Sequence, residues 1–287
     1  MRLRLSLSSL FLLFTLLLAG VEGLAQGRRV NEKVKPFKLI GNIYYVGMSD
    51  MTIFLITTPQ GHMLIDTGYE ENVPWIRESI ETLGFKMQDI KYMLNSHAHT
   101  DHLGGHGIMK ELTGAQVVMS EADGAVLAVG GARPGGRQAY KPVKADRLVK
   151  EGDQVTLGGV TMTAHVFPGH TRGATTWTTV VEENGRRYNV VFWGGMGGIR
   201  EPFVNNKEWP TIAEDYADSL KRAKTLSCDI FFEGHAEGFG FLDKMKKLQA
   251  GEQPNPFYQP AACREGIDKR EREFQAELAK QRADAGR

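Results

Sequence analysis

The sequence is poor in cysteine and carries no excess of charge of either sign. Two cysteines occur in 287 residues, and 35 basic side chains are matched by 34 acidic ones. A protein that follows a phosphate backbone needs a surplus of positive charge, so nucleic acid is not an expected partner. The chain has no short repeat and no low-complexity tract, and its hydrophobic content of 41% is enough for a sizeable core. These features indicate an ordinary globular protein.

Sequence motifs for a serine nucleophile are missing as well. The nearest approach to Ser-x-x-Lys is Ser219-Leu220-Lys221, which places the lysine one position too early. A Gly-x-Ser-x-Gly turn, which would present a serine between a strand and a helix, does not occur. Covalent catalysis through serine therefore has no support in the sequence.

The N-terminus has the pattern of a secretory signal peptide. Two arginines precede an apolar run at 10–19, and a small-x-small cleavage pattern, Gly23-Leu24-Ala25, follows it. A retained membrane anchor is the alternative, but the run is short for a span of ~20 residues, and no lipid-accepting cysteine follows it. We expect residues 1–25 to be removed after Ala25, leaving a single domain at 26–287. The mature protein would be periplasmic or secreted, without stable membrane association.

The two cysteines, Cys228 and Cys263, are candidates for a disulfide. A lone pair of cysteines in an oxidising compartment is a reasonable bridge, and here it would fasten the C-terminal tail to the core. Two buried free thiols are the alternative. The sequence leaves both interpretations open.

Hydrophobic patterns divide the chain into two halves of similar make-up. The first half has expected strands at Leu39–Val46, Thr52–Thr57, His62–Asp66, Ile90–Asn95 and Gln116–Met119, with helices at Glu71–Leu83, Leu103–Leu112 and Glu121–Val129. After a loop at 130–146, the second half has expected strands at Gln154–Leu157, Val160–Phe167, Thr175–Val181, Tyr188–Trp193 and Asp229–Phe232, with helices at Thr211–Thr225 and Phe241–Leu248. A charged tail, Glu265–Ala283, has the pattern of a helix on the domain surface. Two such halves, packed sheet to sheet with their helices outside, would form an α/β sandwich of four layers, with a site in the loops at one edge.

A dense cluster of metal-binding side chains follows the strand that ends at Asn95. Its histidines His97 and His99 alternate, so in an extended stretch both project to the same side and can bind one ion. Asp101 and His102 come next, where the chain turns into a helix, and can reach a second ion. Three histidines and an aspartate within six residues suit Zn²⁺.

Two further histidines stand in similar local settings. His170 and His235 each lie on a glycine-bearing loop directly after an apolar strand. Taken with the dense cluster, both are expected to be metal ligands. His62, His106 and His165 have no such neighbours, and we interpret them as structural.

These motifs resemble the metallo-β-lactamase superfamily, whose signature His-x-His-x-Asp-His stands at 97–102. Within it, the chain is most similar to the third subclass of the zinc-dependent class B β-lactamases. The stretches that carry the similarity are Leu64–Gly68, Leu94–Gly105, Pro168–Trp177 and Pro254–Phe257. The resemblance covers essentially the whole mature chain and implies the αβ/βα sandwich of this family, with two Zn²⁺ per chain.

The resemblance also implies a role for each ligand candidate. The first zinc would take His97, His99 and His170, and the second would take Asp101, His102 and His235. Asp101 is the expected catalytic residue, because it can orient the nucleophile as well as bind the second zinc. Asp66 matches an acid of the family that supports a ligand histidine; a turn-forming aspartate before Gly68 is the alternative.

The segment after the expected strand Tyr188–Trp193 departs from other relatives. Glyoxalase II, lactonase and RNase-type members place a metal-bridging aspartate there, whereas this chain has glycines at 194, 195, 197 and 198. The β-lactamase subclass usually has serines there that hold the substrate carboxylate. Backbone N–H groups of Gly195 and Gly197, or the side chain of Arg200, are candidates for that role; a solvated arginine is the alternative for Arg200.

The expected function is hydrolysis of the β-lactam ring of penicillins, cephalosporins and carbapenems by zinc-activated hydroxide, which would confer antibiotic resistance. A hydrolase of the same superfamily for a lactone, thioester or phosphodiester is the main alternative, and a non-enzymatic zinc-binding protein is another. We expect a monomer that acts on a small molecule.

Overall fold

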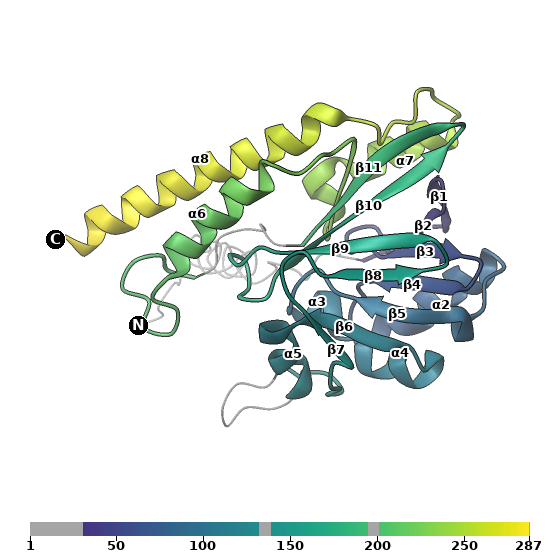
Figure 1. Ribbon diagram of the computed structural model, residues 1–287, viewed down its shortest axis with the longest axis horizontal. Helices are drawn as coiled ribbons and strands as arrows, with labels where there is room; N and C mark the ends of the chain where they lie inside the picture. The colour runs from purple at the N-terminus through teal and green to yellow at the C-terminus, as the bar shows by residue number, and fades with distance from the viewer. Residues whose placement is uncertain (1–30, 132–138, 195–200, 287) are drawn as a thin grey trace, which may run out of the picture. The chain divides into compact units, whose positions relative to one another are not determined.

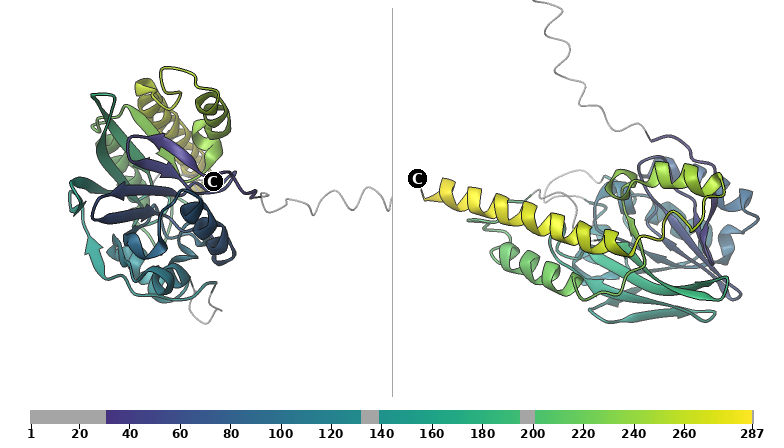
Figure 2. Two further views of the ribbon diagram at one scale, coloured as in Figure 1. Left: turned by 90° about the vertical axis from the view of Figure 1, so that its right-hand side faces the viewer. Right: turned by 90° about the horizontal axis from the view of Figure 1, so that it is seen from above.

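The computed structural model describes residues 31–131, 139–194 and 201–286 (Figures 1 and 2). The expected signal peptide and three candidate substrate-binding residues, Gly195, Gly197 and Arg200, lie outside these ranges. The elements described below belong to the unit Glu32–Arg287. Within the described ranges, none of the helices combines the length and apolar character that crossing a bilayer requires.

The first half of the chain forms a seven-stranded sheet in the order of the sequence. Its strands are β1 (Phe37–Ile40), β2 (Ile43–Tyr45), β3 (Phe54–Thr58), β4 (Gly61–Ile65), β5 (Ile90–Leu94), β6 (Gln116–Ser120) and β7 (Arg147–Val149). Strands β1 to β4 pair antiparallel, and β4 to β7 pair parallel. Parallel neighbours need crossover connections. Helices supply these: α2 (Val73–Thr82), α3 (Thr100–Leu103), α4 (His106–Thr113) and α5 (Glu121–Ala128).

The second half forms a five-stranded sheet in the order β12-β11-β10-β9-β8. Its strands are β8 (Gln154–Leu157), β9 (Val160–Val166), β10 (Thr175–Glu183), β11 (Arg186–Trp193) and β12 (Ile230–Glu233). Only the β11–β12 pair among these is parallel, and α6 (Ile212–Ala223) connects it. The chain ends with α7 (Phe241–Gln249) and the long helix α8 (Pro260–Ala285), while short 3-10 helices occupy Glu70–Asn72, Met87–Asp89 and Ala236–Phe239.

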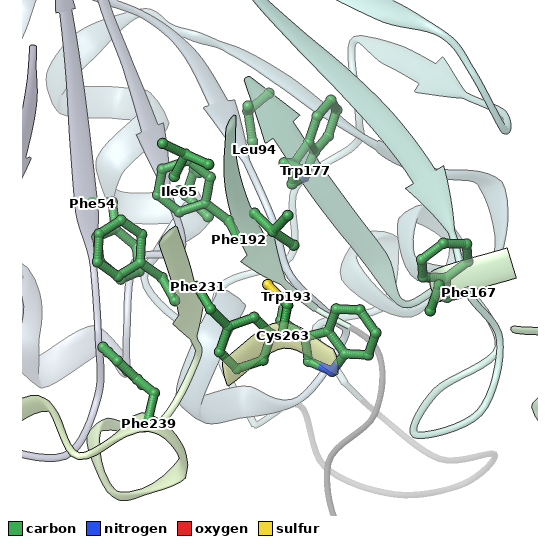
Figure 3. Close-up of a cluster of buried hydrophobic side chains, with 14 of the residues drawn as sticks. Phe54, Ile65, Leu94, Phe167, Trp177, Phe192, Trp193, Phe231, Phe239 and Cys263 are labelled. Carbon is green, nitrogen blue, oxygen red and sulfur yellow. The ribbon is translucent and has the colours of Figure 1, made fainter. Parts of the chain in front are cut away.

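The main core lies between the two sheets (Figure 3). Alternate residues of each strand point inward, which is the period-2 geometry of a strand. Phe54 of β3 lies with its ring centroid 5.1 Å from that of Phe192 of β11 and 4.9 Å from that of Phe232 of β12. Leu94 and Trp177 belong to the same cluster. This contact between sheets holds the two halves together.

Helices cover the outer face of each sheet. Leu55 and Leu64 point away from the core of the sandwich and pack in a second cluster with Ile76 and Ile80 of α2. On the other sheet, the outward residue Trp193 packs against Phe231, and Ile267 of α8 joins the same cluster. Helices α6 and α8 run side by side, and α8 contacts β12 of this sheet (Figures 1 and 2). The predicted α/β sandwich of two similar halves is therefore confirmed.

Some boundaries differ from the sequence-based expectation. The predicted strand Leu39–Val46 is two strands, because the chain turns at Gly41, whose φ is 52°. Strand β7 was not predicted, and α8 begins five residues before the expected Glu265. Of the two interpretations for the cysteines, the structure has the disulfide between Cys228 and Cys263, which links the segment before β12 to the first turn of α8.

Candidate metal centre

The candidate ligands lie at one edge of the sandwich, on loops and on the short helix α3. In the first sheet, β4 and β5 are parallel, so Asp66 after β4 and His97 after β5 come to the same edge. In the second sheet, β9 and β12 run in the same direction, which brings the loops with His170 and His235 to one edge as well. The topology therefore gathers residues that are far apart in the sequence.

Backbone hydrogen bonds join these edges across the two sheets. The N–H of Thr175 donates to the carbonyl of Ser96 at 2.8 Å, and the N–H of Thr52 donates to the carbonyl of Gly234 at 3.1 Å. The indole N–H of Trp177 donates to the carbonyl of Asn95 at 2.9 Å. Each of these bonds fixes a ligand-bearing loop of one half against the other half.

The first group of candidate ligands consists of His97, His99 and His170. One nitrogen from each ring lies within 4.8 Å of the others, and the ring centroids of His170 lie 4.6 Å and 4.5 Å from those of His97 and His99. His97 is 5% exposed, and its Nε2 is buried without a hydrogen-bond partner. A buried, unpaired imidazole nitrogen is costly unless something binds to it.

The protonation of His97 fits the same interpretation. Burial lowers its pKa well below the ordinary value, and the neighbouring imidazoles lower it further. Its Nδ1 lies 3.1 Å from the hydroxyl of Ser96. Since a metal binds neutral imidazole, a ring that resists protonation and has one nitrogen engaged presents the other as a ready ligand.

The second group consists of Asp101, His102 and His235. The Nε2 atoms of the two histidines are 3.2 Å apart, and Oδ2 of Asp101 lies 3.7 Å from Nε2 of His102 and 3.5 Å from Nε2 of His235. Zinc binds such ligands at about 2.0–2.1 Å in a tetrahedron, whose corners are then about 3.3 Å apart. The three separations agree with that spacing, so these residues fit a zinc ion. The ring centroids of His97 and His102 are 4.0 Å apart, which places the two groups side by side.

Electrostatics keep Asp101 ionised within this second group. Burial opposes its ionisation, but the charges of His102 and His235 act the other way, and the pKa of Asp101 is lowered. A carboxylate that stays charged at neutral pH is a suitable metal ligand and can accept a hydrogen bond from a water molecule.

Asp66 lies behind His102. Its Oδ2 is 2.9 Å from Nδ1 of His102, and its Oδ1 accepts a 2.7 Å hydrogen bond from the N–H of Ser96. Burial lowers the pKa of His102, but the hydrogen bond and charge of Asp66 outweigh it, so the net shift is upward. The contact fixes which nitrogen of His102 faces the second group. Asp66 has a φ of 63°, an uncommon conformation that the surrounding contacts hold in place.

Two carboxylates near the site were missed by the sequence analysis. Asp50 has its Oδ2 3.4 Å from Nδ1 of His235, and the N–H of Ala236 donates to its carbonyl. Asp123 is buried beside the loops that carry His97 and His170. Neither stands in a recognisable motif, and only proximity in space reveals them.

The three histidines interpreted as structural belong to neither candidate group in the described ranges. His106 lies 2.8 Å from the hydroxyl of Thr67 through Nδ1, and His62 packs against Phe85 with ring centroids 4.9 Å apart. Both contacts are of the kind that core histidines make.

A family model and solved structures both relate this chain to metallo-beta-lactamases. The model of the metallo-beta-lactamase superfamily matches residues 51–235. The FEZ-1 metallo-beta-lactamase from Legionella gormanii is 38% identical, with a TM-score of 0.84 over 89% of this chain and 99% of that one. The class B3 di-zinc metallo-beta-lactamase LRA-12 from an Alaskan soil metagenome is 34% identical, with a TM-score of 0.80 over 86% of this chain and 95% of that one.

A curated relative carries a different name. A hydroxyacylglutathione hydrolase of Hyphomonas neptunium is 34% identical over 137 residues, which are 48% of this chain and 44% of that protein. The chain spans about a third to a half of the length of the curated relatives that it matches. The family match covers more than half of the chain, so the protein belongs to the metallo-beta-lactamase superfamily.

Proposed function

We propose that this member of the superfamily is an exported zinc-dependent β-lactamase that opens the ring of penicillins, cephalosporins and carbapenems. The observation that carries the proposal is the pair of adjoining groups, three histidines in one and Asp101, His102 and His235 in the other. A di-zinc class B3 metallo-beta-lactamase is among the similar structures. The likeness to these structures extends over most of the chain, whereas the match to the curated hydroxyacylglutathione hydrolase covers about half.

The residues of the two groups would bind the metal ions and orient the attacking water. His97, His99 and His170 would hold one Zn²⁺, and Asp101, His102 and His235 would hold a second. Bound zinc makes water acidic enough to supply hydroxide near pH 7 and polarises a carbonyl group. Asp101 is ionised and borders both histidines of its group, so it would orient the attacking water as well as bind metal. Asp66 would keep His102 in the productive orientation.

The group that anchors the substrate is also a proposal. A β-lactam carries a carboxylate, and the chain has backbone N–H groups at Gly195 and Gly197 and a cation at Arg200 directly after the strand β11. These groups would bind the substrate carboxylate by donating hydrogen bonds to it. All three lie outside the described ranges.

Hydrolysis of a thioester is the second candidate function, because the hydroxyacylglutathione hydrolase is a relative in sequence. The glycine-rich segment 194–198 weighs against it, since it has no carboxylate to bridge two metals. At Gly194 a Cβ atom would lie 2.0 Å from the carbonyl oxygen of Thr175 and 2.5 Å from that of Ser96. A side chain at the first position of the segment would therefore require one of these backbone segments to move.

Export to the periplasm, or secretion, belongs to the same proposal. A signal peptide at 1–25 would direct it, and the disulfide between Cys228 and Cys263 suits an oxidising compartment. We propose a monomer that meets β-lactam antibiotics outside the cytoplasm and confers resistance to them.

A spectrophotometric assay of the purified mature chain tests the proposal. We expect hydrolysis of a carbapenem and a chromogenic cephalosporin, loss of both activities with a chelator, and recovery with added zinc. A thioester substrate in the same assay provides the comparison. Full zinc occupancy without turnover of any β-lactam would reject the proposal in favour of the second candidate.

A further inference from the structure

Asp123 is a buried carboxylate on the first turn of α5, and it is 1% exposed. Among the Asp and Glu residues of the described ranges, only Asp66 is buried to a similar degree. Asp66 contacts a candidate ligand directly, so its burial has an evident reason. The hydrogen bonds of Asp123 go to residues that neighbour candidate ligands in the sequence, and these bonds explain its place.

The carboxylate of Asp123 receives hydrogen bonds from both loops of the first group. Nδ2 of Asn95 donates to Oδ2 at 3.0 Å, and the hydroxyl of Thr171 donates to Oδ1 at 3.3 Å. The N–H of Gly173 donates to the same carboxylate. Asn95 stands two residues before His97, and Thr171 directly follows His170. One side chain from a third element therefore holds both loops at once.

The loop with His170 also packs tightly against α5. A Cβ atom at Gly173 would lie 2.5 Å from Oδ1 of Asp123 and 2.2 Å from the hydroxyl of Ser120. That hydroxyl donates to the carbonyl of Gly173 at 2.6 Å. The close approach and the hydrogen bonds fix the distance between the loop that carries His170 and helix α5.

We propose that Asp123 is a positioning residue for the first metal position, which sets the distance between His170 and the pair His97 and His99. Asp66 contacts His102 of the second position and reaches His97 of the first through Ser96, whereas the hydrogen bonds of Asp123 go to the two loops of the first group. This inference rests on the proposed zinc binding. It adds a buried carboxylate, Asp123, that supports the first position alone.

Asp123→Asn keeps the shape of the side chain but replaces one acceptor oxygen by an N–H donor. The new N–H donor would face the N–H groups of Asn95 or Gly173. Two donors cannot form a hydrogen bond with each other, so one hydrogen bond between Asp123 and a ligand-bearing loop is lost. Replacement of such an outer partner typically weakens metal binding by about 10- to 100-fold. We expect a loss of at least about tenfold at the first position and a loss below about twofold at the second.

Two background variants separate the positions. His235→Ala leaves only the first group complete, and His170→Ala leaves only the second. Zinc affinity is measured in each by competition with a chromophoric chelator, with and without Asp123→Asn. The loss is expected in the His235→Ala background alone. Equal losses in both backgrounds, or none, would overturn the proposal.

Asp229→Asn is the matched control. Its Oδ2 also accepts from an asparagine, through the side chain and the backbone N–H of Asn189, both at 2.8 Å. It lies before β12, at the end of that strand remote from His235. We expect zinc affinity to stay unchanged in both backgrounds. If Asp229→Asn weakens zinc binding as much as Asp123→Asn does, the effect is a general one of a damaged fold, and the specific role of Asp123 is overturned.

Thr171→Val provides a second route if Asp123→Asn does not fold. It removes one hydrogen bond to Asp123 and retains the branched shape, and we expect a smaller loss confined to the first position. An unchanged affinity there would contradict the proposal. If the wild type binds two zinc ions but hydrolyses no β-lactam, the proposed substrate is rejected, and the positioning role of Asp123 still stands. Wild-type protein that binds no zinc would reject both.

Discussion

Burial shifts the pKa of Asp123 away from its ordinary value. It raises the pKa of this carboxyl to about 7, although the hydrogen bonds from Asn95, Thr171 and Gly173 act in the opposite direction. In the unfolded chain the same group has an ordinary pKa near 3.8. Between these two values the folded protein binds more protons than the unfolded chain. The contribution of Asp123 to the free energy of unfolding therefore decreases as pH rises from about 4 to about 7.

Asp123→Asn should remove this dependence. We expect the wild type to lose stability relative to the variant as pH rises from 5 to 7, and the difference to stay constant above about pH 7.5. Urea unfolding of both proteins across pH 5–8.5, with chelator present so that bound metal makes no contribution, measures the difference. Two curves that run parallel over the whole range would show that Asp123 does not titrate there.

Single residues differ in how visible they are in the sequence. The run His97-Ala98-His99-Thr100-Asp101-His102 was visible because its ligands are dense and its spacing is specific. His170 and His235 were found through their place after apolar strands. Asp123 stands in an acidic first helical turn, which is a common place for a carboxylate. Only the fold shows that it faces Asn95 and Thr171 rather than solvent.

At the scale of elements, α8 is held at several points along its length to segments of the second half that lie between β11 and β12. The disulfide from Cys228 fixes its first turn. Further along, Phe274 packs on Tyr216 of α6 with ring centroids 5.0 Å apart. Near its end, Oε1 of Gln281 accepts a 2.6 Å hydrogen bond from the N–H of Phe203. None of these contacts involves a candidate metal ligand.

Removal of the disulfide should therefore lower stability without changing metal content. Cys228 and Cys263 are separated by 35 residues, and a closed loop of that length corresponds to about 3–4 kcal/mol of unfolding free energy in the chain-entropy account. We expect a loss of this order in the double variant Cys228→Ser, Cys263→Ser, measured by urea unfolding at fixed zinc concentration. Zinc stoichiometry should match the wild type, and unchanged stability would contradict the expectation.

Long elements with a regular pattern were predictable and short ones were not. The helix expected at Thr211–Thr225 is α6 with slightly later start and earlier end, because its apolar residues recur at helical spacing. Strand β7 has three residues, too few for any alternation to show. The single strand expected at Leu39–Val46 is divided because Gly41 and Asn42 form a turn inside an apolar run, where the hydrophobic pattern masks the turn signal.

At the scale of the whole molecule, the site exists because two sheets bring four loops to one edge. The six ligand candidates come from segments up to 138 residues apart, since 235 minus 97 is 138. Local patterns cannot give the distance between such segments. The grouping into three and three was implied by family resemblance, whereas the separations of 3.2 Å and 3.5 Å between His235 and the residues His102 and Asp101 come from the packing of the two halves.

Anomalous diffraction at the zinc edge, from crystals of the zinc-loaded protein, tests the two adjoining metal positions most directly. The account predicts two peaks, one among His97, His99 and His170 and one among Asp101, His102 and His235. A single peak, or metal bound away from these six side chains, would contradict it.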